Sequence, residues 1–306
     1  MVQDAHPIKT SPRINVAVSP LSWVNEVLHD LGAGTTAAQC LSEAASAGFQ
    51  GVEMSRIFPR DAVQLQATLG EYSLQLASGW HDGFLTERDV EQELEAVAAH
   101  ATLLRHCGAS VMVYGECGWM ADNALDIPLS QRRLLPAEKI PVYAARLTAF
   151  ARQLHERYGL KLAYHHHLMM VAEQLDEIKK LLSACGEEVG LLLDTGHATA
   201  AGFDYAELIK AFPARICHVH LKDVRPAVLE QVKDQGLTFN QGVRAGMFTV
   251  PGDGSTDYRA LAHFLATSNY QGWVVVEAEQ DPAQANPLAF VTRAHQFVTQ
   301  HILPQA

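Results

Sequence analysis

The stretches V-G-L-L-L-D at residues 189–194 and R-I-C-H-V-H-L at residues 215–221 are the most informative about the architecture of this chain. Each is a short, nearly continuous apolar run, which is typical of a parallel β-strand covered by helices on both faces. Between them lies a helical segment at residues 204–212, with Asp204 as its N-cap and Pro213 directly after its end. A strand, a helix and a second strand in this order predict one unit of a parallel sheet.

The same alternation of apolar runs and helical segments extends along the chain. Helical segments at residues 36–47, 87–107 and 141–158 each end directly before a glycine, which is common at helix C-termini. Eight such units most simply close into a (β/α)8 barrel, the TIM barrel of the α/β class. An open doubly wound sheet is the alternative, but no G-x-G-x-x-G follows the first strand to support its dinucleotide-binding form. The eight predicted strands are residues 13–19, 50–54, 74–79, 110–114, 160–165, 189–194, 215–221 and 272–277.

The length of the chain, 306 residues, is that of one α/β barrel, so we expect a single domain over residues 1–306. Residues 1–12 contain two prolines and scattered polar side chains, and we expect them to form a loosely held tail. The N-terminus has no apolar core of a signal peptide, and no run approaches the about 20 apolar residues that span a bilayer. We therefore expect a cytoplasmic protein without a membrane partner.

Charge and cysteine content restrict the expected partners further. The formal net charge is −11, and the Lys and Arg residues do not gather into a basic stripe. A phosphate backbone would be repelled by most of such a surface, so we do not expect nucleic acid as a partner. The five cysteines show no C-x-x-C spacing and are expected to be reduced thiols. Small polar molecules remain the expected ligands.

Two predicted connections between a strand and the following helix are long, at residues 115–136 and 223–254. In a barrel both would lie at the carboxyl ends of the strands, where TIM barrels bind their substrates. Loops of this length often act as lids over a binding site. Contacts between subunits are an equally good interpretation.

Each of the last four predicted strands ends in polar side chains. Because the carboxyl ends of parallel strands meet at one rim of a barrel, these side chains are expected to lie close together. His and carboxylate side chains from four neighbouring strands predict a mixed nitrogen and oxygen site for a divalent ion such as Mn²⁺, Co²⁺, Zn²⁺ or Fe²⁺. The four strand ends read Y-H-H-H (164–167), D-T-G-H (194–197), H-V-H-L-K-D (218–223) and E-A-E-Q-D (277–281).

Strand alternation decides which of these side chains share a face, because neighbouring residues of a strand point to opposite sides. The residues alone leave three pairs of alternatives open for the metal site. These pairs are His165 with His167, His218 with His220, and Glu277 with Glu279.

Beyond their chemistry, these segments resemble one known family. Their sequences are similar to those of inosose dehydratases, which belong to the xylose-isomerase-like TIM-barrel superfamily together with sugar epimerases. The similarity is dense over residues 155–300 and sparser before them, where 54–59 and 78–82 depart from the family pattern. The motifs are A-Y-H-H-H (163–167), L-L-D-T-G-H (192–197), H-V-H-L-K-D-V-R (218–225), G-L-T-F (236–239), G-M-F-T-V-P-G-D-G (246–254) and V-V-V-E-A-E-Q-D-P-x-x-A-N-P-L (274–288).

The resemblance implies a choice among the alternative metal ligands. Related epimerases hold their metal with Glu, Asp, His and Glu, and His165 stands where the first Glu would be, which lowers the negative charge of the site by one. The implied ligands are His165, Asp194, His220 and Glu277. The candidate proton-transfer residues are His167, His197, Lys222 and Glu279. The candidate substrate contacts are Trp23, Glu53, Trp80, His81 and His218, although core packing is the simpler role for at least one of the two tryptophans.

The resemblance also implies a reaction, cofactors and an assembly. Inosose dehydratases remove water from 2-keto-myo-inositol, a cyclic keto-polyol, to give a trihydroxycyclohexanedione during myo-inositol catabolism. A metal, with Mn²⁺ or Co²⁺ expected first, would stabilise the enediolate that forms when the proton beside the ketone leaves. Glutathione is implied only by the family, and relatives are often homo-oligomers. The alternative within the superfamily is an isomerase or epimerase of another ketose or keto-sugar.

Overall fold

The computed structural model describes residues 14–303, so the tail expected at residues 1–12 lies outside the described part of the chain. All eight predicted strands are present, and they lie parallel to their neighbours in one nearly closed sheet of nine strands. The order of the strands in the sheet is β3-β2-β1-β11-β8-β7-β6-β5-β4. Their bounds are β1 Ile14–Val18, β2 Gly51–Glu53, β3 Gln75–Ser78, β4 Trp80–Gly83, β5 Val111–Glu116, β6 Lys161–His165, β7 Val189–Asp194, β8 Ile216–Leu221 and β11 Gly272–Val276.

The ninth strand arises because the third predicted strand is longer than expected and is divided at Gly79. Its first part, β3, pairs with β2, and its second part, β4, pairs with β5. The same stretch of chain therefore connects both edges of the sheet, as a barrel requires. A side chain at Gly79 would place its Cβ 2.8 Å from Cε1 of His100 on helix α3 (Val90–His106), so a larger residue there would require the His100 ring to shift.

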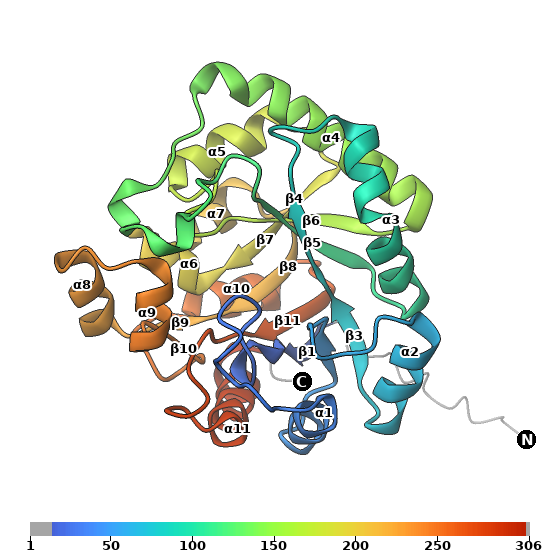
Figure 1. Ribbon diagram of the computed structural model, residues 1–306, viewed down its shortest axis with the longest axis vertical. Coiled ribbons are helices and arrows are strands. Elements are labelled where there is room, and N and C mark those ends of the chain that lie inside the picture. Colours follow the sequence, from blue (N-terminus) through green and yellow to red (C-terminus); the bar gives the residue numbers. More distant parts are fainter. Residues whose placement is uncertain (1–13, 304–306) are drawn as a thin grey trace, which may run out of the picture.

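Helices lie around the outside of the strands (Figure 1). The predicted helices are confirmed, and Thr36 and Asp89 cap α1 and α3 through their side chains. Helix α7 is shorter than predicted, and its N-cap is Tyr205 and not Asp204, although the Asp204 side chain accepts a hydrogen bond from the backbone N–H of Ala206. No helix within residues 14–303 is long and apolar enough to cross a membrane. The remaining bounds are α1 Ala37–Ser46, α2 Ala62–Glu71, α4 Ile140–Tyr158, α5 Leu175–Ala184, α6 Thr195–Ala201, α7 Ala206–Ala211, α10 Arg259–Thr267 and α11 Pro287–Phe297.

The apolar core is divided by the sheet into an outer layer and an inner one. The outer layer packs alternate strand residues against the helices, whereas small inner clusters include Ala163, Leu192 and Val275. Since side chains alternate along a strand, the next inward positions on β6 and β7 are His165 and Asp194. Packing of the barrel interior therefore determines which polar side chains point into its mouth.

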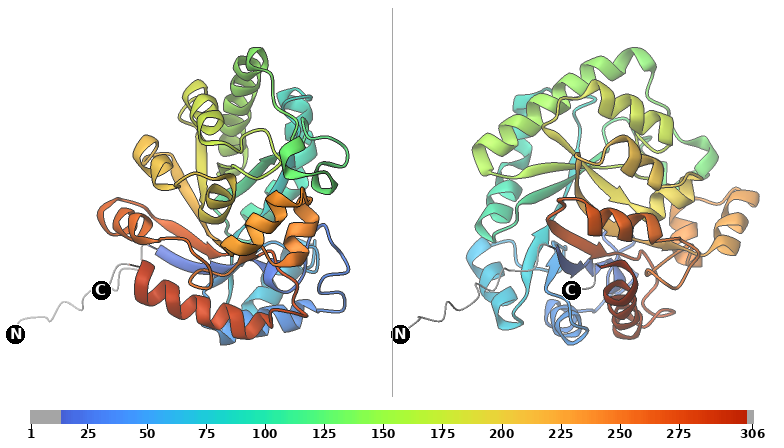
Figure 2. Two further views of the ribbon diagram at one scale, coloured as in Figure 1. Left: turned by 90° about the vertical axis from the view of Figure 1, so that its left-hand side faces the viewer. Right: turned by 180° about the vertical axis from the view of Figure 1, so that it is seen from behind.

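The two long connections lie beside each other over this mouth, as the side view of Figure 2 shows. Residues 117–136 contain short 3-10 helices, and the second connection contains β9 (Asp223–Val224), α8 (Pro226–Asp234), α9 (Phe239–Ala245) and β10 (Phe248–Thr249). Asn240 donates a hydrogen bond to Asp126 at 2.8 Å, and apolar residues of both connections share a separate cluster. The two connections thus pack together over the barrel mouth around a small apolar core of their own.

The second connection is held to the barrel by Asp223, which is 1% exposed. Its carboxylate accepts hydrogen bonds from the backbone N–H groups of Val224 and Thr256 at 2.8 Å, Gly252 at 3.0 Å and Gly254 at 3.1 Å. Four backbone donors thus depend on one buried carboxylate, and loss of its hydrogen bonds is destabilising.

We therefore predict that Asp223→Ala lowers the free energy of unfolding by about 3 kcal/mol or more, because four backbone N–H groups lose their partner at once. Asp234→Ala is the matched control, since Asp234 is exposed and lies in the same connection. Urea unfolding followed by circular dichroism measures both variants. Equal midpoints for the two variants would contradict this account of the connection.

Candidate metal centre and substrate pocket

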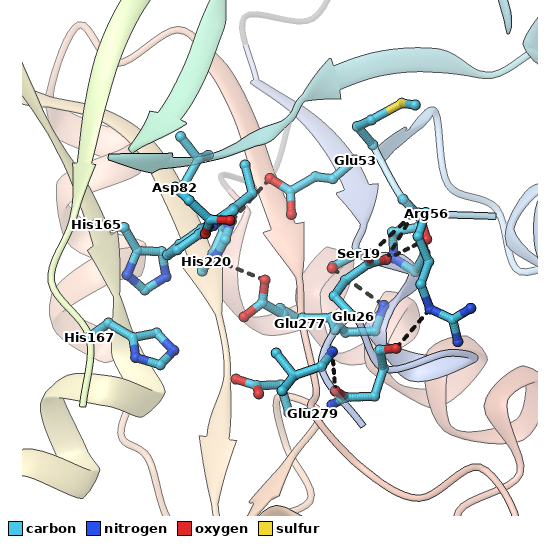
Figure 3. Close-up of a pocket in the computed structure, with 18 of the residues that line it drawn as sticks. Ser19, Glu26, Glu53, Arg56, Asp82, His165, His167, His220, Glu277 and Glu279 are labelled. Carbon is cyan, nitrogen blue, oxygen red and sulfur yellow. Dashed lines mark hydrogen bonds and ion pairs between the residues drawn. The ribbon is translucent and has the colours of Figure 1, made fainter. Parts of the chain in front are cut away.

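A cavity of about 430 Å³ opens at the carboxyl ends of the strands. Side chains from both halves of the chain line it, as the close-up in Figure 3 shows. His165, His220 and Glu277 point toward one another on one side, and the 54–59 loop forms part of the opposite side. This is the face of a TIM barrel on which substrates bind.

The structure brings the four implied metal ligands together at the base of this cavity. Oδ2 of Asp194 lies 3.5 Å from Nε2 of His165 and 3.6 Å from Nδ1 of His220. Oε2 of Glu277 lies 3.1 Å from the same Nδ1 of His220. All four side chains are at most 6% exposed, so these atoms face one another in a space almost closed to bulk water.

Hydrogen bonds assign the ring nitrogens of the two histidines. Nδ1 of His165 lies 2.7 Å from the carbonyl oxygen of His166, to which it donates, and this leaves the lone pair on Nε2. Nε2 of His220 lies 3.1 Å from Oε1 of Glu53, to which it donates, and this leaves Nδ1 toward Asp194 and Glu277. Metal-binding histidines commonly donate their other N–H to a carboxylate or a carbonyl in this way.

Each of the two carboxylates likewise has one oxygen bound by a neighbouring group and the other directed at the centre. Oδ1 of Asp194 accepts the backbone N–H of His197 at 2.7 Å and so caps α6, whereas the buried Oδ2 has no hydrogen-bond partner within the described residues. Oε1 of Glu277 accepts from Nζ of Lys222 at 2.6 Å, which leaves Oε2 toward His220. One atom of each of the four side chains is therefore held by the protein, and the other faces the centre.

The charges around this centre are strongly coupled. Burial acts to raise the pKa of Glu277, but His220 and Lys222 outweigh it and lower the pKa to about 2. Burial likewise acts against ionisation of Asp194, but Lys222 and neighbouring histidines hold its pKa well below the usual value. For His220 burial acts to lower the pKa, and the carboxylates of Glu277 and Glu53 prevail and raise it well above the usual value.

Lys222 lies behind the centre and joins Glu277 to Glu279. Its Nζ donates to Glu277 at 2.6 Å and to Glu279 at 2.8 Å, and it is fully buried. Burial acts to lower its pKa, but Glu277 and Glu279 raise it above the usual value, so the amine stays charged. A Cβ at Gly196 would lie 2.5 Å from Cγ of Lys222, and this explains the glycine in D-T-G-H.

His197 could be mistaken for a ligand, because it belongs to a group of four within 4.8 Å that also contains His165, Asp194 and Glu277. Both of its nitrogens are engaged, since Nδ1 accepts the N–H of Leu168 at 3.3 Å and Nε2 lies 2.9 Å from Nζ of Lys222. His220 has a nitrogen without a hydrogen-bond partner within residues 14–303, and it therefore fits the centre better.

His167 lies in the pocket wall with its ring centroid 3.7 Å from that of His197. Its Nδ1 lies 2.6 Å from the carbonyl oxygen of Leu168 and donates to it, so the lone pair is on Nε2. Burial lowers the pKa of His167 to about 4, and the ring is neutral near pH 7. Glu279 also lines the pocket, where Lys222 lowers its pKa against the effect of burial.

Trp80 forms an apolar wall of the pocket, with 36% of the residue exposed. Its indole is fixed because Nε1 donates to Asp82 at 2.6 Å, and it meets His165 edge-on at 5.6 Å between centroids. A Cβ at Gly115 would come within 2.1 Å of the indole. Asp82 was not predicted from the sequence, although it shares a strand face with Trp80 once the strand is extended past Gly79.

Three other residues expected at the substrate do not line the pocket. His81 points outward to helix α3, where Nε2 lies 2.6 Å from Glu93. Trp23 is fully buried and donates from Nε1 to Glu43 on α1 at 2.6 Å. His218 lies below the pocket with Nε2 3.0 Å from Glu53, so it supports that carboxylate. Glu53 itself lines the pocket as expected.

The fold and this arrangement of strand-end ligands define one class of protein. The family described as xylose isomerase-like TIM barrel matches residues 41–296, and the chain belongs to this family. The barrel and the resemblance expected from the sequence are thereby confirmed.

Two relatives show where in the family the chain lies. It is 42% identical over 283 residues to the rhizopine catabolism protein MocC of Rhizobium meliloti, covering 92% of this chain and 87% of that protein. It is 38% identical over 290 residues to an inosose dehydratase of Clostridium botulinum, covering 94% of this chain and 97% of that protein.

Solved structures with low sequence identity share the same barrel. One is the IolI protein with a bound zinc atom, with a TM-score of 0.65, 15% identity and coverage of 94% of this chain and 95% of that one. Another is the D-allulose 3-epimerase from Methylomonas sp. in complex with D-allulose, with a TM-score of 0.65, 17% identity and coverage of 96% and 99%. At these identities the similarity shows the fold alone.

Proposed function

We propose that this chain dehydrates 2-keto-myo-inositol to a trihydroxycyclohexanedione in inositol catabolism, as a metal-dependent carbon–oxygen lyase. The support comes from relatives named inosose dehydratase that are 38% identical over more than nine-tenths of the chain. The observation that carries the proposal is the set of four convergent donor atoms at the base of the pocket.

In this proposal the ligands are Nε2 of His165, Oδ2 of Asp194, Nδ1 of His220 and Oε2 of Glu277. The buried Oδ2 of Asp194 and Nδ1 of His220 have no hydrogen-bond partner among the described residues, as expected of atoms reserved for an ion. A mixed set of two imidazoles and two carboxylates suits Mn²⁺ or Co²⁺, and also Zn²⁺. A divalent ion held there would supply Lewis-acid stabilisation of negative charge on the ketone oxygen of the substrate.

The proposed substrate position follows from the walls of the pocket. The apolar faces of a cyclohexane ring would lie against the indole of Trp80, which Asp82 holds in place. Carboxylates of Glu53 and Glu279 line the pocket and would accept hydrogen bonds from ring hydroxyls. A neutral polyol fits such a surface because each hydroxyl can donate to a carboxylate.

Proton transfer would involve the two candidate residues that face the pocket. Nε2 of His167 would accept the proton beside the ketone, because Leu168 holds its tautomer and its low pKa keeps it neutral. The proton that His167 takes up would then pass to the departing hydroxyl, which leaves as water, while the carboxylate of Glu279, held by Lys222, accepts a hydrogen bond from that hydroxyl. Lys222 and His197 lie behind these groups and would supply charge and orientation.

The alternative is a metal-dependent isomerase or epimerase of another ketose or keto-sugar. Removal of a proton beside a ketone is common to both reactions, and only the fate of the neighbouring hydroxyl differs. The departures of residues 54–59 and 78–82 from the family pattern lie at or next to the pocket, where they would affect the choice of substrate.

The proposal predicts that purified protein with Mn²⁺ or Co²⁺ converts 2-keto-myo-inositol to the dione, which absorbs in the near ultraviolet. The appearance of this absorption measures turnover directly. Assays with and without glutathione test whether the family's implied cofactor is used. Turnover of a ketose without any dione from 2-keto-myo-inositol would replace the dehydratase by the isomerase.

A variant tests the assigned base. His167→Gln should lower kcat by about 100-fold or more, because it removes the proton acceptor, while bound metal stays at the wild-type level. His29→Gln is the matched control, since His29 is exposed and outside the pocket lining. Metal analysis of each purified variant accompanies the kinetics. A kcat close to that of wild type would remove His167 from this role.

The proposed metal centre also predicts that metal binding releases protons. Without metal His220 carries a proton near pH 7, because Glu277 and Glu53 raise its pKa against the effect of burial. Binding of Co²⁺ at Nδ1 should release about one proton per ion, and affinity should rise with pH. Calorimetry in two buffers of different ionisation enthalpy counts the released protons, and Asp194→Asn should weaken binding severely. Proton release that is absent between pH 6 and 8, about one unit either side of neutrality, would contradict the protonation of His220 in the metal-free centre.

A further inference from the structure

We propose that Arg132 is a positioning residue that docks the 117–136 segment against the loop between β6 and α5. Through this contact it holds His167 and Met170 in the pocket wall. The geometry is independent of the reaction, but the kinetic consequence rests on the proposed function. Arg132 lies far in sequence from every strand end discussed above.

The contacts of Arg132 all go to one loop and the first turn of α5. Its side chain is 6% exposed, and Nη2 lies 2.7 Å from Oε1 of Glu177. Nε lies 3.3 Å from Oε2 of Glu173, and Nη1 donates to the carbonyl oxygen of Met170 at 3.0 Å. A planar guanidinium can satisfy several acceptors in different directions at once, which an ammonium group on a flexible stem does less well.

The loop between β6 and α5, which Arg132 contacts, has a tightly turned backbone. Met169 has a φ of +70°, in the left-handed region that is unfavourable for a residue with a side chain. Its backbone N–H donates to Oε2 of Glu173 at 2.7 Å, the same oxygen that faces Nε of Arg132. A conformation of this kind persists only when its surroundings hold it, and Arg132 and Glu173 supply that support.

This loop carries two residues of the pocket wall. His167 and Met170 line the pocket and are joined by a hydrogen bond from the N–H of Met170 to the carbonyl of His167 at 3.2 Å. The 117–136 segment contributes Met120 and Leu125 to the same pocket. Its beginning is fixed where the N–H of Gly118 donates to Glu116 at 3.0 Å. Arg132 thus joins two walls that meet at the substrate.

Three variants test the role of Arg132. Arg132→Met removes the charge with little change in length, Arg132→Lys keeps the charge without the fork, and Glu173→Gln weakens one contact while keeping the shape. Arg133→Met is the matched control, because the exposed Arg133 stacks 3.9 Å above the ring of Trp119 and makes no ion pair among the described residues. Hydrogen exchange of peptides covering residues 117–131 and 168–173 is measured together with kcat, KM and metal content.

We expect Arg132→Met to speed exchange in both peptides and to lower kcat/KM about tenfold or more, because His167 is no longer held in place. Metal content should stay unchanged, and Arg132→Lys and Glu173→Gln should fall between wild type and Arg132→Met. Exchange and kinetics equal to those of Arg133→Met would overturn the proposal. If wild-type protein does not dehydrate 2-keto-myo-inositol, the exchange measurement still decides the docking by itself. A wild-type enzyme that dehydrates this substrate, with no effect of Arg132→Met on exchange, would refute the docking alone.

Discussion

The hydrogen bond from Nε2 of His220 to Oε1 of Glu53 is the interaction on which the rest of the centre depends. It joins β2 to β8 and leaves Nδ1 of His220 directed at Asp194 and Glu277. Without it the ring could turn its other nitrogen inward, and the four donor atoms would no longer converge. His218 supports the same carboxylate from below, so a cluster of buried groups holds one ring in one orientation.

The barrel makes this arrangement attainable through strand alternation and close packing. On β6 and β7 the residues just below His165 and Asp194 on the inner face are apolar and fill the barrel, so the polar side chain comes only at the rim. Glycines then make room for long side chains, as Gly196 does for Lys222. The buried amine neutralises carboxylates that would otherwise repel one another, and a stable apo centre can therefore keep several acidic groups close together.

Much of this could be predicted from the sequence, because it depends on local periodicity. All eight strands were predicted within a few residues, and the strand ends indicated a shared rim. The prediction of which side chains face the pocket fails after Gly79, because the strand continues there as β4. Trp80 and Asp82 therefore face the pocket and His81 faces outward. The role of Arg132 could not be predicted, because its partners are 38 to 45 residues away in sequence and no periodic pattern connects them. The selection of His220 over His218 required the resemblance as well, since both lie on the same strand face.

The most direct test of the centre is anomalous diffraction from crystals grown with Co²⁺, recorded on both sides of the cobalt absorption edge. The account predicts one anomalous peak, with Nε2 of His165, Oδ2 of Asp194, Nδ1 of His220 and Oε2 of Glu277 each at a coordination distance of about 2.0–2.3 Å. Glu53 should remain hydrogen-bonded to Nε2 of His220. An ion bound to Nε2 of His220 with Glu53 as its neighbouring ligand would contradict the account.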